Sequence, residues 1–425
     1  MKHALLVGGA TGREHGIAKH FYSNEDYILS AILWADNQYV KRLCQGSYSV
    51  MELTDVDAVF EEIRSVSPDF VIIGQGEVIQ RGLKDMLRNV GIPCIAPTYE
   101  SAKIEGSKTY LRNLLQKIDP ELNPKYRDFY EYSSEVEEYI NSFDNKVVVK
   151  CDGVISGPRV RLYDLPSQAT EATENAKMWL ENYGHIIVEE YIDGEEIAIM
   201  SFTDGVHLVH TFPFKNHKRI NEGNVGENTS GMGTVAGKDC FSYMTQRVKE
   251  KIYGITERIL QECNKVSDDK YTGSLYGEFL VCGDRIKVIE YNCRFGNPSF
   301  INMLQLMNVD FPCLCEHILD GTIDELHDVW KDKISISVYV VPKDYTISKE
   351  YVKTEVDFSD VSEDMLFVGN MSYKGDKFFL KNSRAFAVCA IGDTIEEVRH
   401  TVYSELEKIK GNIYYRKDIG IWGIK

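Results

Sequence analysis

The first hundred residues alternate short, continuous apolar runs with segments of helical character. The apolar runs lie at residues 4–7, 28–34, 70–73 and 92–95, and the helical segments lie at residues 13–21, 56–65 and 80–89. Continuous apolar runs of this length are typical of parallel strands that are buried on both faces, with helices as the crossover connections. The pattern predicts a doubly wound, parallel-stranded α/β domain over about residues 1–100.

The hydrophobic pattern changes after residue 100. A helix over residues 101–116 is predicted to lead out of the first domain. Strands then dominate, interrupted by one helix, at residues 146–150, 160–162, 186–191, 197–202 and 206–210, with the helix at 167–182. Longer elements return up to residue 330, and a smaller α+β region follows them. We therefore expect a multidomain α/β and α+β chain with domains over residues 1–100, 101–330 and 331–425.

The balance of charges narrows the classes of ligand. The chain has 48 basic and 65 acidic residues, which gives a formal net charge of −17. Such an acidic chain is poorly suited to nucleic acid or to an anionic membrane, although local lysines can still bind a small nucleotide. No apolar run approaches the length of a membrane span. The ten cysteines show no Cys-x-x-Cys pair and no zinc spacing, which favours reduced thiols in a cytoplasmic protein.

The most informative segment, residues 288–298, reads Val-Ile-Glu-Tyr-Asn-Cys-Arg-Phe-Gly-Asn-Pro. Its alternation predicts a half-buried strand that ends near Glu290 and Asn292, whose side chains point to the same face. Both side chains offer hard oxygen ligands that suit Mg²⁺. Arg294 would continue this face, and the three groups together would suit a magnesium-bound phosphate chain. An edge strand that ends in a polar turn would give the same pattern.

Three further segments have the character of phosphate contacts. The glycine-rich turn at residues 8–12 follows a strand and opens a helix, where backbone amides favour anions. Lys108 lies where residues 105–108 begin a helix, and Lys150 ends the apolar run 147–149 before a loop of small residues. A lysine at such a strand end can clamp a phosphate. A tight turn, a solvated lysine and an edge-strand lysine are the structural alternatives.

Two polar stretches in the middle of the chain have the character of nucleotide and anion contacts. Residues 188–196 read as a strand, a short turn and a second strand, and the exposed backbone of such a hinge can pair with the edge of an adenine. An ordinary acidic hairpin would look the same. The basic triplet His217-Lys218-Arg219 precedes a long glycine-rich stretch at residues 226–233. Long loops of this kind are often functional or disordered.

Taken in order, these segments resemble the phosphoribosylamine–glycine ligases, also called glycinamide ribonucleotide synthetases, of the ATP-grasp superfamily. The resemblance extends over nearly the whole chain. Its motifs include Gly12-Arg13-Glu14-His15, Lys150-Cys151-Asp152-Gly153, Asn228-Thr229-Ser230-Gly231-Met232-Gly233, Glu290-Tyr291-Asn292-Cys293-Arg294 and Arg416-Lys417-Asp418-Ile419-Gly420. Each motif alone is a weak signal, but their order across the chain is specific. The resemblance implies an N-terminal α/β domain, an ATP-grasp domain with a lid at about residues 120–190, and a C-terminal α+β domain.

The resemblance also implies contacts to the nucleotide. Lys108 and Lys150 would hold the phosphates of ATP. Glu189 and the backbone at Tyr191 would meet the adenine, and Glu196 would meet the ribose. ATP with Mg²⁺ or Mn²⁺ is therefore the expected cofactor set.

Metal and substrate contacts follow from the same resemblance. The metal would be bound by Glu290 and Asn292, with Glu278 as a further ligand, as a glutamate is in other ATP-grasp ligases. Arg294 and Lys150 would stabilise the transferred phosphoryl group. The small-molecule substrates, glycine and a phosphorylated amine, would meet the N-terminal turn through Gly12, Arg13 and His15 and the basic triplet through Lys218 and Arg219.

Several positions depart from the family pattern. The loop after Lys150 reads Gly157-Pro158-Arg159 where a Gly-Lys-Gly is usual, and proline removes an amide donor there. The segment Gly296-Asn297-Pro298-Ser299 lacks two carboxylates, and Asn216 stands where an aspartate is usual. Two alternatives therefore stay open. One is a divergent ligase that joins a different small acid to a different amine, and the other is a nucleotide-binding protein without catalytic activity.

Overall fold

The computed structural model describes residues 1–153, 160–346 and 354–421. Its N-terminal part contains a five-stranded parallel sheet in the order β3-β2-β1-β4-β5. The strands are β1 (Lys2–Gly8), β2 (Tyr27–Leu33), β3 (Tyr48–Val50), β4 (Phe70–Ile73) and β5 (Cys94–Ile95). The helices are α1 (Gly12–Tyr22), α2 (Gln38–Leu43), α3 (Val56–Val66), α4 (Gly76–Ile79) and α5 (Leu83–Asn89). The predicted doubly wound domain is confirmed, with the helix expected at 80–89 starting later, at Leu83.

The helix predicted over residues 101–116 is broken at Ser107. It forms α6 (Tyr99–Gly106) and α7 (Lys108–Ile118). Ser107 has extended backbone angles and its side chain accepts a hydrogen bond from the Tyr110 N–H, so it ends one helix and caps the next. This break places Lys108 at the first turn of α7, as the segment 105–108 indicated.

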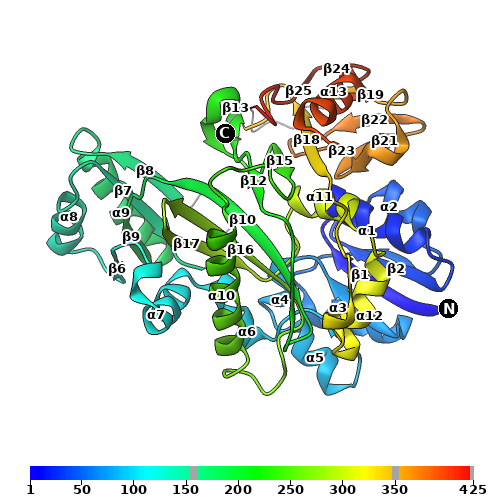
Figure 1. The fold of residues 1–425 in the computed structure, drawn as a ribbon, viewed down its shortest axis with the longest axis horizontal. Helices are drawn as coiled ribbons and strands as arrows, with labels where there is room; N and C mark the ends of the chain where they lie inside the picture. Colours follow the sequence, from blue (N-terminus) through cyan, green and yellow to red (C-terminus); the bar gives the residue numbers. More distant parts are fainter. Residues whose placement is uncertain (154–159, 347–353, 422–425) are drawn as a thin grey trace.

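A four-stranded sheet in the order β6-β9-β7-β8 forms a separate body at the left of Figure 1. It contains β6 (Tyr126–Phe129), β7 (Lys146–Cys151), β8 (Val160–Asp164) and β9 (Ile186–Glu190), with α8 (Ser134–Asn141) and α9 (Ala169–Tyr183). Its buried side chains form a core of their own, which includes Trp179 and Tyr163. This subdomain corresponds in position to the lid expected at about residues 120–190.

The largest sheet has ten strands, eight of them in the order β17-β16-β10-β12-β15-β18-β23-β20. Its strands are β10 (Glu195–Thr203), β11 (Leu208–His210), β12 (Phe214–Asn216), β15 (Gly233–Ala236), β16 (Gly273–Cys282), β17 (Arg285–Asn292), β18 (Ile334–Pro342), β20 (Leu366–Val368), β23 (Phe386–Gly392) and β25 (Ile413–Tyr414). β15 pairs with β18, so the sheet runs without a break past residue 330, where the sequence suggested a boundary. The C-terminal part therefore shares its sheet with the central part.

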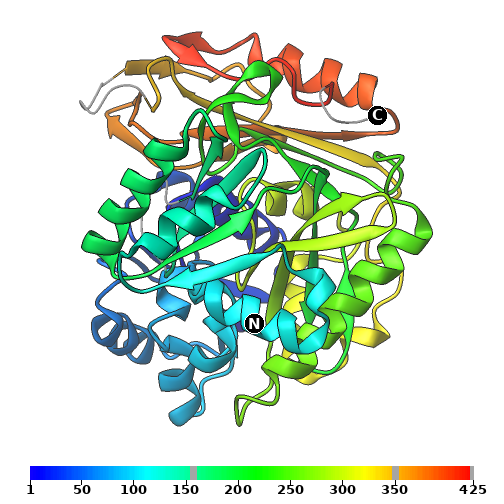
Figure 2. The same ribbon diagram turned by 90° about the vertical axis from the view of Figure 1, so that its left-hand side faces the viewer.

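Smaller elements complete the molecule. The hairpin β13 (Arg219–Asn221) and β14 (Val225–Asn228) precedes β15. Helices α10 (Gln246–Cys263) and α11 (Ser299–Leu306) pack on the large sheet, whereas α12 (Phe311–Asp320) packs on α1 and β5 of the N-terminal part. The C-terminal layer, orange and red in Figure 2, adds β19 (Thr354–Asp357), β21 (Met371–Lys374), β22 (Lys377–Leu380), β24 (Lys410–Gly411) and α13 (Ile395–Leu406).

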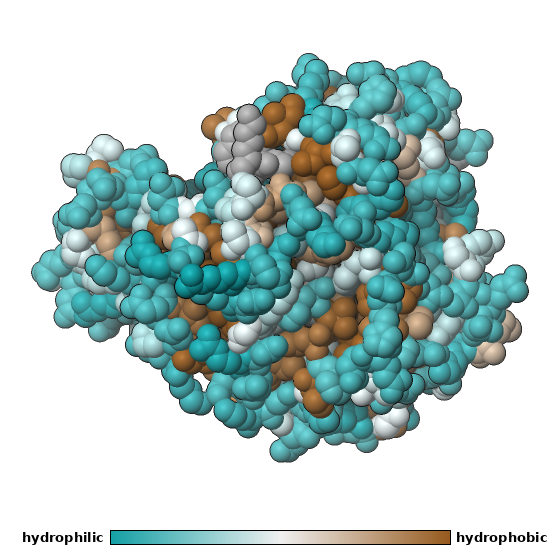
Figure 3. All heavy atoms as spheres, viewed as in Figure 1, coloured by the Kyte–Doolittle hydropathy of each residue, from teal (hydrophilic) through white to brown (hydrophobic). Residues whose placement is uncertain are grey.

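The surface is mainly hydrophilic on the face shown in Figure 3, with apolar side chains in separate patches. This agrees with the high content of charged residues, 27% of the chain. Among the helices of the described residues, none combines the length and the apolar character that crossing a membrane requires.

Candidate active site

The metal ligands expected from the sequence lie on two paired strands. Glu278 of β16 stands opposite Glu290 of β17, next to a register shift, so both carboxylates project from the same face of the sheet. The Asn292 side-chain amide donates to Glu290 Oε1 at 3.2 Å, and Arg294 Nη2 donates to Asn292 Oδ1 at 3.2 Å. Glu290, Asn292 and Arg294 therefore meet as their spacing predicted, and Glu278 joins them from the neighbouring strand.

Lys218 lies among these carboxylates rather than facing an open anion site. Its ammonium is 2.7 Å from Glu196 Oε1 and also binds Glu278. Burial opposes the charge of Lys218, but Glu196, Glu278 and Glu290 outweigh burial and raise its pKa well above the usual range. Lys218 and Glu196, expected at the substrate and at the ribose, are thus ion-paired to one another.

The pKa values of Glu278 and Glu290 are shifted in opposite directions. Burial raises the pKa of Glu278, and the neighbouring Glu290 and Glu196 add to this effect against the attraction of Lys218. For Glu290, burial is outweighed by Lys218, by the hydrogen bond from Asn292 and by the charges of Lys108 and Lys150, so its pKa is lowered. Two carboxylates and an amide oxygen on one face match the donor set that a hard divalent cation prefers.

A chain of hydrogen bonds through Tyr276 and Asn216 holds the Glu278 carboxylate in position. The Tyr276 hydroxyl donates to Glu278 Oε1 at 2.8 Å, and the Asn216 amide donates to the Tyr276 hydroxyl at 2.5 Å. Thr234 donates in turn to Asn216 Oδ1 at 2.8 Å. Asn216, which departs from the family pattern in sequence, thereby orients the phenol that holds Glu278 in place.

Lys150 belongs to a buried network with Glu189 and Arg112. Lys150 Nζ is 2.6 Å from Glu189 Oε2, and Arg112 Nε is 2.7 Å from Glu189 Oε1. Arg112 also donates to the carbonyls of Val288 and Ile289 on β17. Burial disfavours the Glu189 carboxylate, but Arg112 and Lys150 outweigh burial and lower its pKa to about 2. Both oxygens of Glu189, expected at the adenine, are therefore bound to cations.

No local sequence pattern indicates a role for Arg112. It lies on α7 between Leu111 and Leu114, both of which face the core. Its partner Glu189 comes 77 residues later in the chain, so no local pattern connects the two.

Lys108 begins α7 beside the loop that follows β7. Its backbone N–H donates to Asp152 Oδ1 at 2.5 Å, and the Ser107 hydroxyl donates to Asp152 Oδ2 at 2.7 Å. The start of the loop after Lys150 is thereby tied to the start of the helix. Residues 154–159, which include Gly157-Pro158-Arg159, lie outside the described part of the chain, so the expected phosphate loop stays a prediction.

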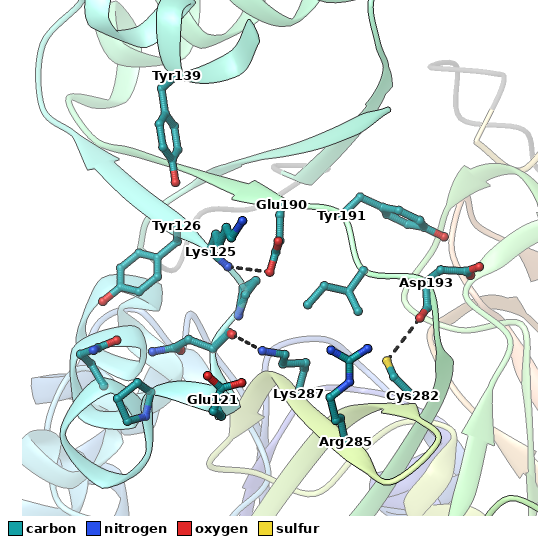
Figure 4. A pocket seen from close by; sticks show the side chains of 15 residues that line it. Glu121, Lys125, Tyr126, Tyr139, Glu190, Tyr191, Asp193, Cys282, Arg285 and Lys287 are labelled. Atoms are coloured by element: carbon teal, nitrogen blue, oxygen red, sulfur yellow. Dashed lines mark hydrogen bonds between the residues drawn. The ribbon is translucent and has the colours of Figure 1, made fainter. Parts of the chain in front are cut away.

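The hinge between β9 and β10 borders a cavity of about 820 Å³. Figure 4 shows Glu190 and Tyr191 on one side of it and Arg285 and Lys287 on the other. Lys287 Nζ donates to the Asn123 carbonyl at 2.8 Å, and Glu190 accepts from the Lys125 backbone at 2.9 Å. The backbone at Tyr191, expected at the adenine, lines this cavity.

The N-terminal turn is packed against the rest of the protein. A Cβ added to Gly12 would lie 2.9 Å from both the Phe367 carbonyl and the Tyr339 hydroxyl, so only glycine fits there. Arg13 is 2.6 Å from Glu14 and donates to the Phe295 carbonyl at 2.7 Å. The turn expected at the sugar phosphate thus also joins the N-terminal domain to the central and C-terminal strands.

His15 is buried in the same turn, and its Nδ1 accepts the Val368 N–H at 3.0 Å. Burial, followed by the charges of Lys19 and Arg42, lowers the pKa of His15 well below its usual range. The ring is therefore neutral in the folded protein, and the contact expected between this turn and the sugar phosphate stays a prediction. Arg219, expected at the substrate, forms a hydrogen bond within its own hairpin. Its Nη1 donates to the Gly226 carbonyl at 2.9 Å, between β13 and β14.

The neutral His15 predicts a pH dependence of stability. Below about pH 6.5 the unfolded chain binds a proton at this residue that the folded chain does not, so stability is lost as the pH falls. His15 alone should contribute a slope of about 1.4 kcal/mol per pH unit between there and its lower folded pKa. We expect His15→Gln to reduce the slope by this amount in urea unfolding at pH 5–7. The exposed His327→Gln serves as the control, and an equal slope in both variants would contradict the prediction.

Comparisons with known proteins cover nearly the whole chain. Three family models match it: the N domain of phosphoribosylglycinamide synthetase over residues 3–105, its ATP-grasp (A) domain over 106–300, and its C domain over 335–422. Phosphoribosylamine–glycine ligase from Methanococcus maripaludis is 31% identical, over 98% of this chain and 96% of the relative. The enzyme of that name from Methanobrevibacter smithii is 32% identical with the same coverage of both chains.

Solved structures agree in fold. The crystal structure of phosphoribosylamine–glycine ligase from Thermotoga maritima superimposes with a TM-score of 0.78 at 22% identity, over 98% of this chain and 100% of that chain. The biotin carboxylase domain of the Hydrogenobacter thermophilus 2-oxoglutarate carboxylase, in complex with MgADP, gives a TM-score of 0.74 at 13% identity, over 98% and 92%. With the full-length sequence relatives, these matches show that the chain belongs to the phosphoribosylamine–glycine ligase family and has its N-terminal, ATP-grasp and C-terminal architecture.

Proposed function

We propose that this protein joins glycine to 5-phosphoribosylamine at the expense of ATP, giving glycinamide ribonucleotide, ADP and phosphate in de novo purine synthesis. Full-length relatives of this name support the proposal. One structural observation carries it: where β17 ends, Glu290, Asn292 and Arg294 lie together, and Glu278 of the paired strand β16 lies beside them. The N-terminal turn and the C-terminal strands border the same region, because Arg13 contacts Phe295 and Tyr339 contacts Asn297.

We assign the roles from the contacts. Glu278, Glu290 and Asn292 would hold Mg²⁺ or Mn²⁺, which when bound would neutralise the charge of the ATP phosphates. Lys108 and Lys150 would contact those phosphates, and the hinge backbone at Tyr191 would meet the adenine. Glu189 acts through Lys150, because its carboxylate holds the ammonium in place at 2.6 Å.

The chemistry follows from the weak electrophilicity of a carboxylate. Transfer of the γ-phosphoryl group of ATP to the glycine carboxylate gives an acyl phosphate, and ADP leaves. Arg294 and Lys150 would stabilise the negative charge on the transferring group. The amine of phosphoribosylamine then attacks the carbonyl carbon and phosphate leaves, which forms the amide. Because water would hydrolyse the acyl phosphate, the β6–β9 subdomain is proposed to close over ATP as a lid.

The alternative of a different acid and amine rests on Asn297 and Ser299, which replace two carboxylates. Asn297 Oδ1 accepts the Tyr339 hydroxyl at 2.6 Å, so its side chain is turned toward the C-terminal strands. The assay should therefore offer Mg²⁺-ATP with glycine and with phosphoribosylamine made in situ from ribose 5-phosphate and ammonia. Turnover that requires both substrates, with glycinamide ribonucleotide identified by mass spectrometry, supports the proposal. ADP release with another acid or amine in place of glycine or phosphoribosylamine would favour the alternative.

The cellular setting is part of the proposal. All ten cysteines lie in the described part of the chain, where none of them forms a disulfide. Free thiols are usual in a reducing compartment, which supports a cytoplasmic enzyme with small-molecule substrates.

Glu278 provides a test of the metal site. We expect Glu278→Gln to raise the Mg²⁺ concentration that gives half-maximal turnover by about 10- to 100-fold, because one charged ligand is lost while Tyr276 still holds the side chain. The measurement is a magnesium titration at saturating ATP, with the exposed Glu257→Gln of α10 as the control. An unchanged magnesium requirement in Glu278→Gln would remove Glu278 from the ligand set.

A further inference from the structure

Three arginines from distant parts of the chain meet at the backbone of residues 295–297. Arg13 Nη1 donates to the Phe295 carbonyl at 2.7 Å, and Arg294 Nη1 reaches the same carbonyl at 3.4 Å. Arg384, which immediately precedes the β23 region, donates from Nη1 to the Asn297 carbonyl at 2.9 Å. The N-terminal, central and C-terminal parts of the protein thus each contribute one guanidinium group to the same turn.

Two of these arginines have a carboxylate partner. Arg13 is 2.6 Å from Glu14, and Arg294 Nε is 3.3 Å from Glu105. Within the described residues, Arg384 has no carboxylate at ion-pair distance. Its Nη1 binds the carbonyls of Ser230 and Gly231 at 2.8 and 3.1 Å, and its guanidinium lies 4.7 Å from the centre of the Tyr339 ring. Its Nε and Nη2 donate to no described residue.

No carboxylate of the described residues balances the charge of Arg384. Burial lowers the pKa of Arg384 against the opposing effects of Tyr339 and Tyr345, and repulsion from Arg13 and Arg294 adds to the lowering, although the guanidinium stays protonated. A partly buried cation that is fixed by neutral carbonyls and faces two like charges lacks the anion that normally balances it. Because Nη1 is held by protein carbonyls while Nε and Nη2 have no acceptor among the described residues, an anion with two adjacent oxygens would complete the site.

We propose that Arg384 binds the phosphate group of the phosphoribosylamine substrate through its Nε and Nη2 edge. This inference rests on the proposed function and names the residue that recognises the sugar phosphate. It replaces the contact expected from Arg13 and His15, whose polar groups bind Glu14, Phe295 and Val368.

The phosphate fits this position better than the glycine carboxylate does. The carboxylate must accept the phosphoryl group beside Glu290, Asn292 and Arg294. In phosphoribosylamine, the phosphate and the attacking amine lie at opposite ends of the sugar. With the amine at the acyl phosphate, the phosphate would lie a sugar's length away from Asn292, and Arg384, which contacts the Asn297 carbonyl, is the cation that we place there.

The experiment compares two ligands that differ only in the phosphate: glycinamide ribonucleotide and its dephosphorylated ribonucleoside. Titration calorimetry would measure both affinities for the wild-type protein, for Arg384→Gln and for Arg384→Lys. We expect the wild type to prefer the phosphorylated ligand by about 10- to 100-fold, the scale of a charge-assisted hydrogen-bond pair. Arg384→Gln should reduce this preference to less than about 3-fold, with Arg384→Lys between the two.

The matched control is Lys377→Gln, which removes an exposed cation that pairs with Glu355 on the neighbouring strand. It should keep the full preference. If Arg384 only holds the turn in shape, Arg384→Gln will weaken both ligands equally and keep their ratio, which would overturn the proposal. The same holds if the wild type shows no preference, or if Arg384→Gln raises only the KM for glycine, which would assign the carboxylate.

This test is independent of the proposed function. Absence of turnover with glycine and phosphoribosylamine in the wild-type protein would reject the ligase assignment. The ratio of the two affinities would still decide whether Arg384 binds a sugar phosphate.

Discussion

Arg294→Ala should lower kcat/KM by at least ~100-fold, the scale of losing one preorganised charge next to the transferred group. The guanidinium is held in a fixed direction by Glu105 at 3.3 Å, by Asn292 at 3.2 Å and by the Phe295 carbonyl. Burial works against its charge, but Glu105, Tyr276 and the two metal-site carboxylates raise its pKa, so it stays protonated. An alanine removes both the charge and this fixed direction.

The loss should appear in turnover rather than in folding. Glu105 keeps its hydrogen bond to the Cys293 N–H at 2.7 Å after the substitution, so thermal unfolding should change little. Arg294→Lys should recover only part of the activity, because an ammonium lacks the planar fork that spans Asn292 and Glu105. Steady-state kinetics with all three substrates provides the measurement, with the exposed Arg247→Ala of α10 as the control. Turnover of Arg294→Ala within a few-fold of wild type would remove Arg294 from the catalytic assignment.

How far the sequence predicts this fold depends on how local each signal is. The strand at residues 70–73 is observed with the same limits, because a run of four apolar residues between polar ones defines it completely. β12 and β15 were not predicted, since each has only three or four residues and exists through pairing with the other and with β10 or β18. Helix α11 is buried over nearly its whole circumference and so lacks the amphipathic period that identifies a helix.

The same distinction applies to the site. Glu290, Asn292 and Arg294 follow one another within five residues, and their proximity could be read from strand geometry. Partners from distant segments could not be predicted: Lys218 binds Glu278 across 60 residues, and Arg13 reaches Phe295 across 282. A sequence shows that these residues are charged, but it does not show which charge will neutralise them. Arg112 and Arg384 had no local signal for the same reason.

Lys150→Ala and Glu189→Gln should separate catalysis from stability within one buried network. Removing Lys150 should lower kcat/KM by at least ~100-fold, because a phosphate contact is lost. Its effect on folding should be the smaller of the two, since Glu189 keeps Arg112 at 2.7 Å. Glu189→Gln instead removes the carboxylate that neutralises both cations. We expect it to lower the free energy of unfolding by about 3–5 kcal/mol, the cost of breaking a buried ion pair.

The pKa of Glu189 determines how its contribution to stability changes with pH. The pKa of Glu189 is about 2 in the folded protein, below the ordinary value near 4.5. Its stabilising contribution is therefore present above that ordinary value and is lost as the pH falls toward 2. Urea unfolding at a series of pH values should show a constant stability difference between wild type and Glu189→Gln from pH 7 to about pH 5, which narrows progressively below about pH 4.5. The neighbouring Glu190→Gln is the matched control: it faces the hinge cavity and should cost less than about 1 kcal/mol. Equal stability losses in Glu189→Gln and Glu190→Gln would mean that the network does not hold Lys150 in place.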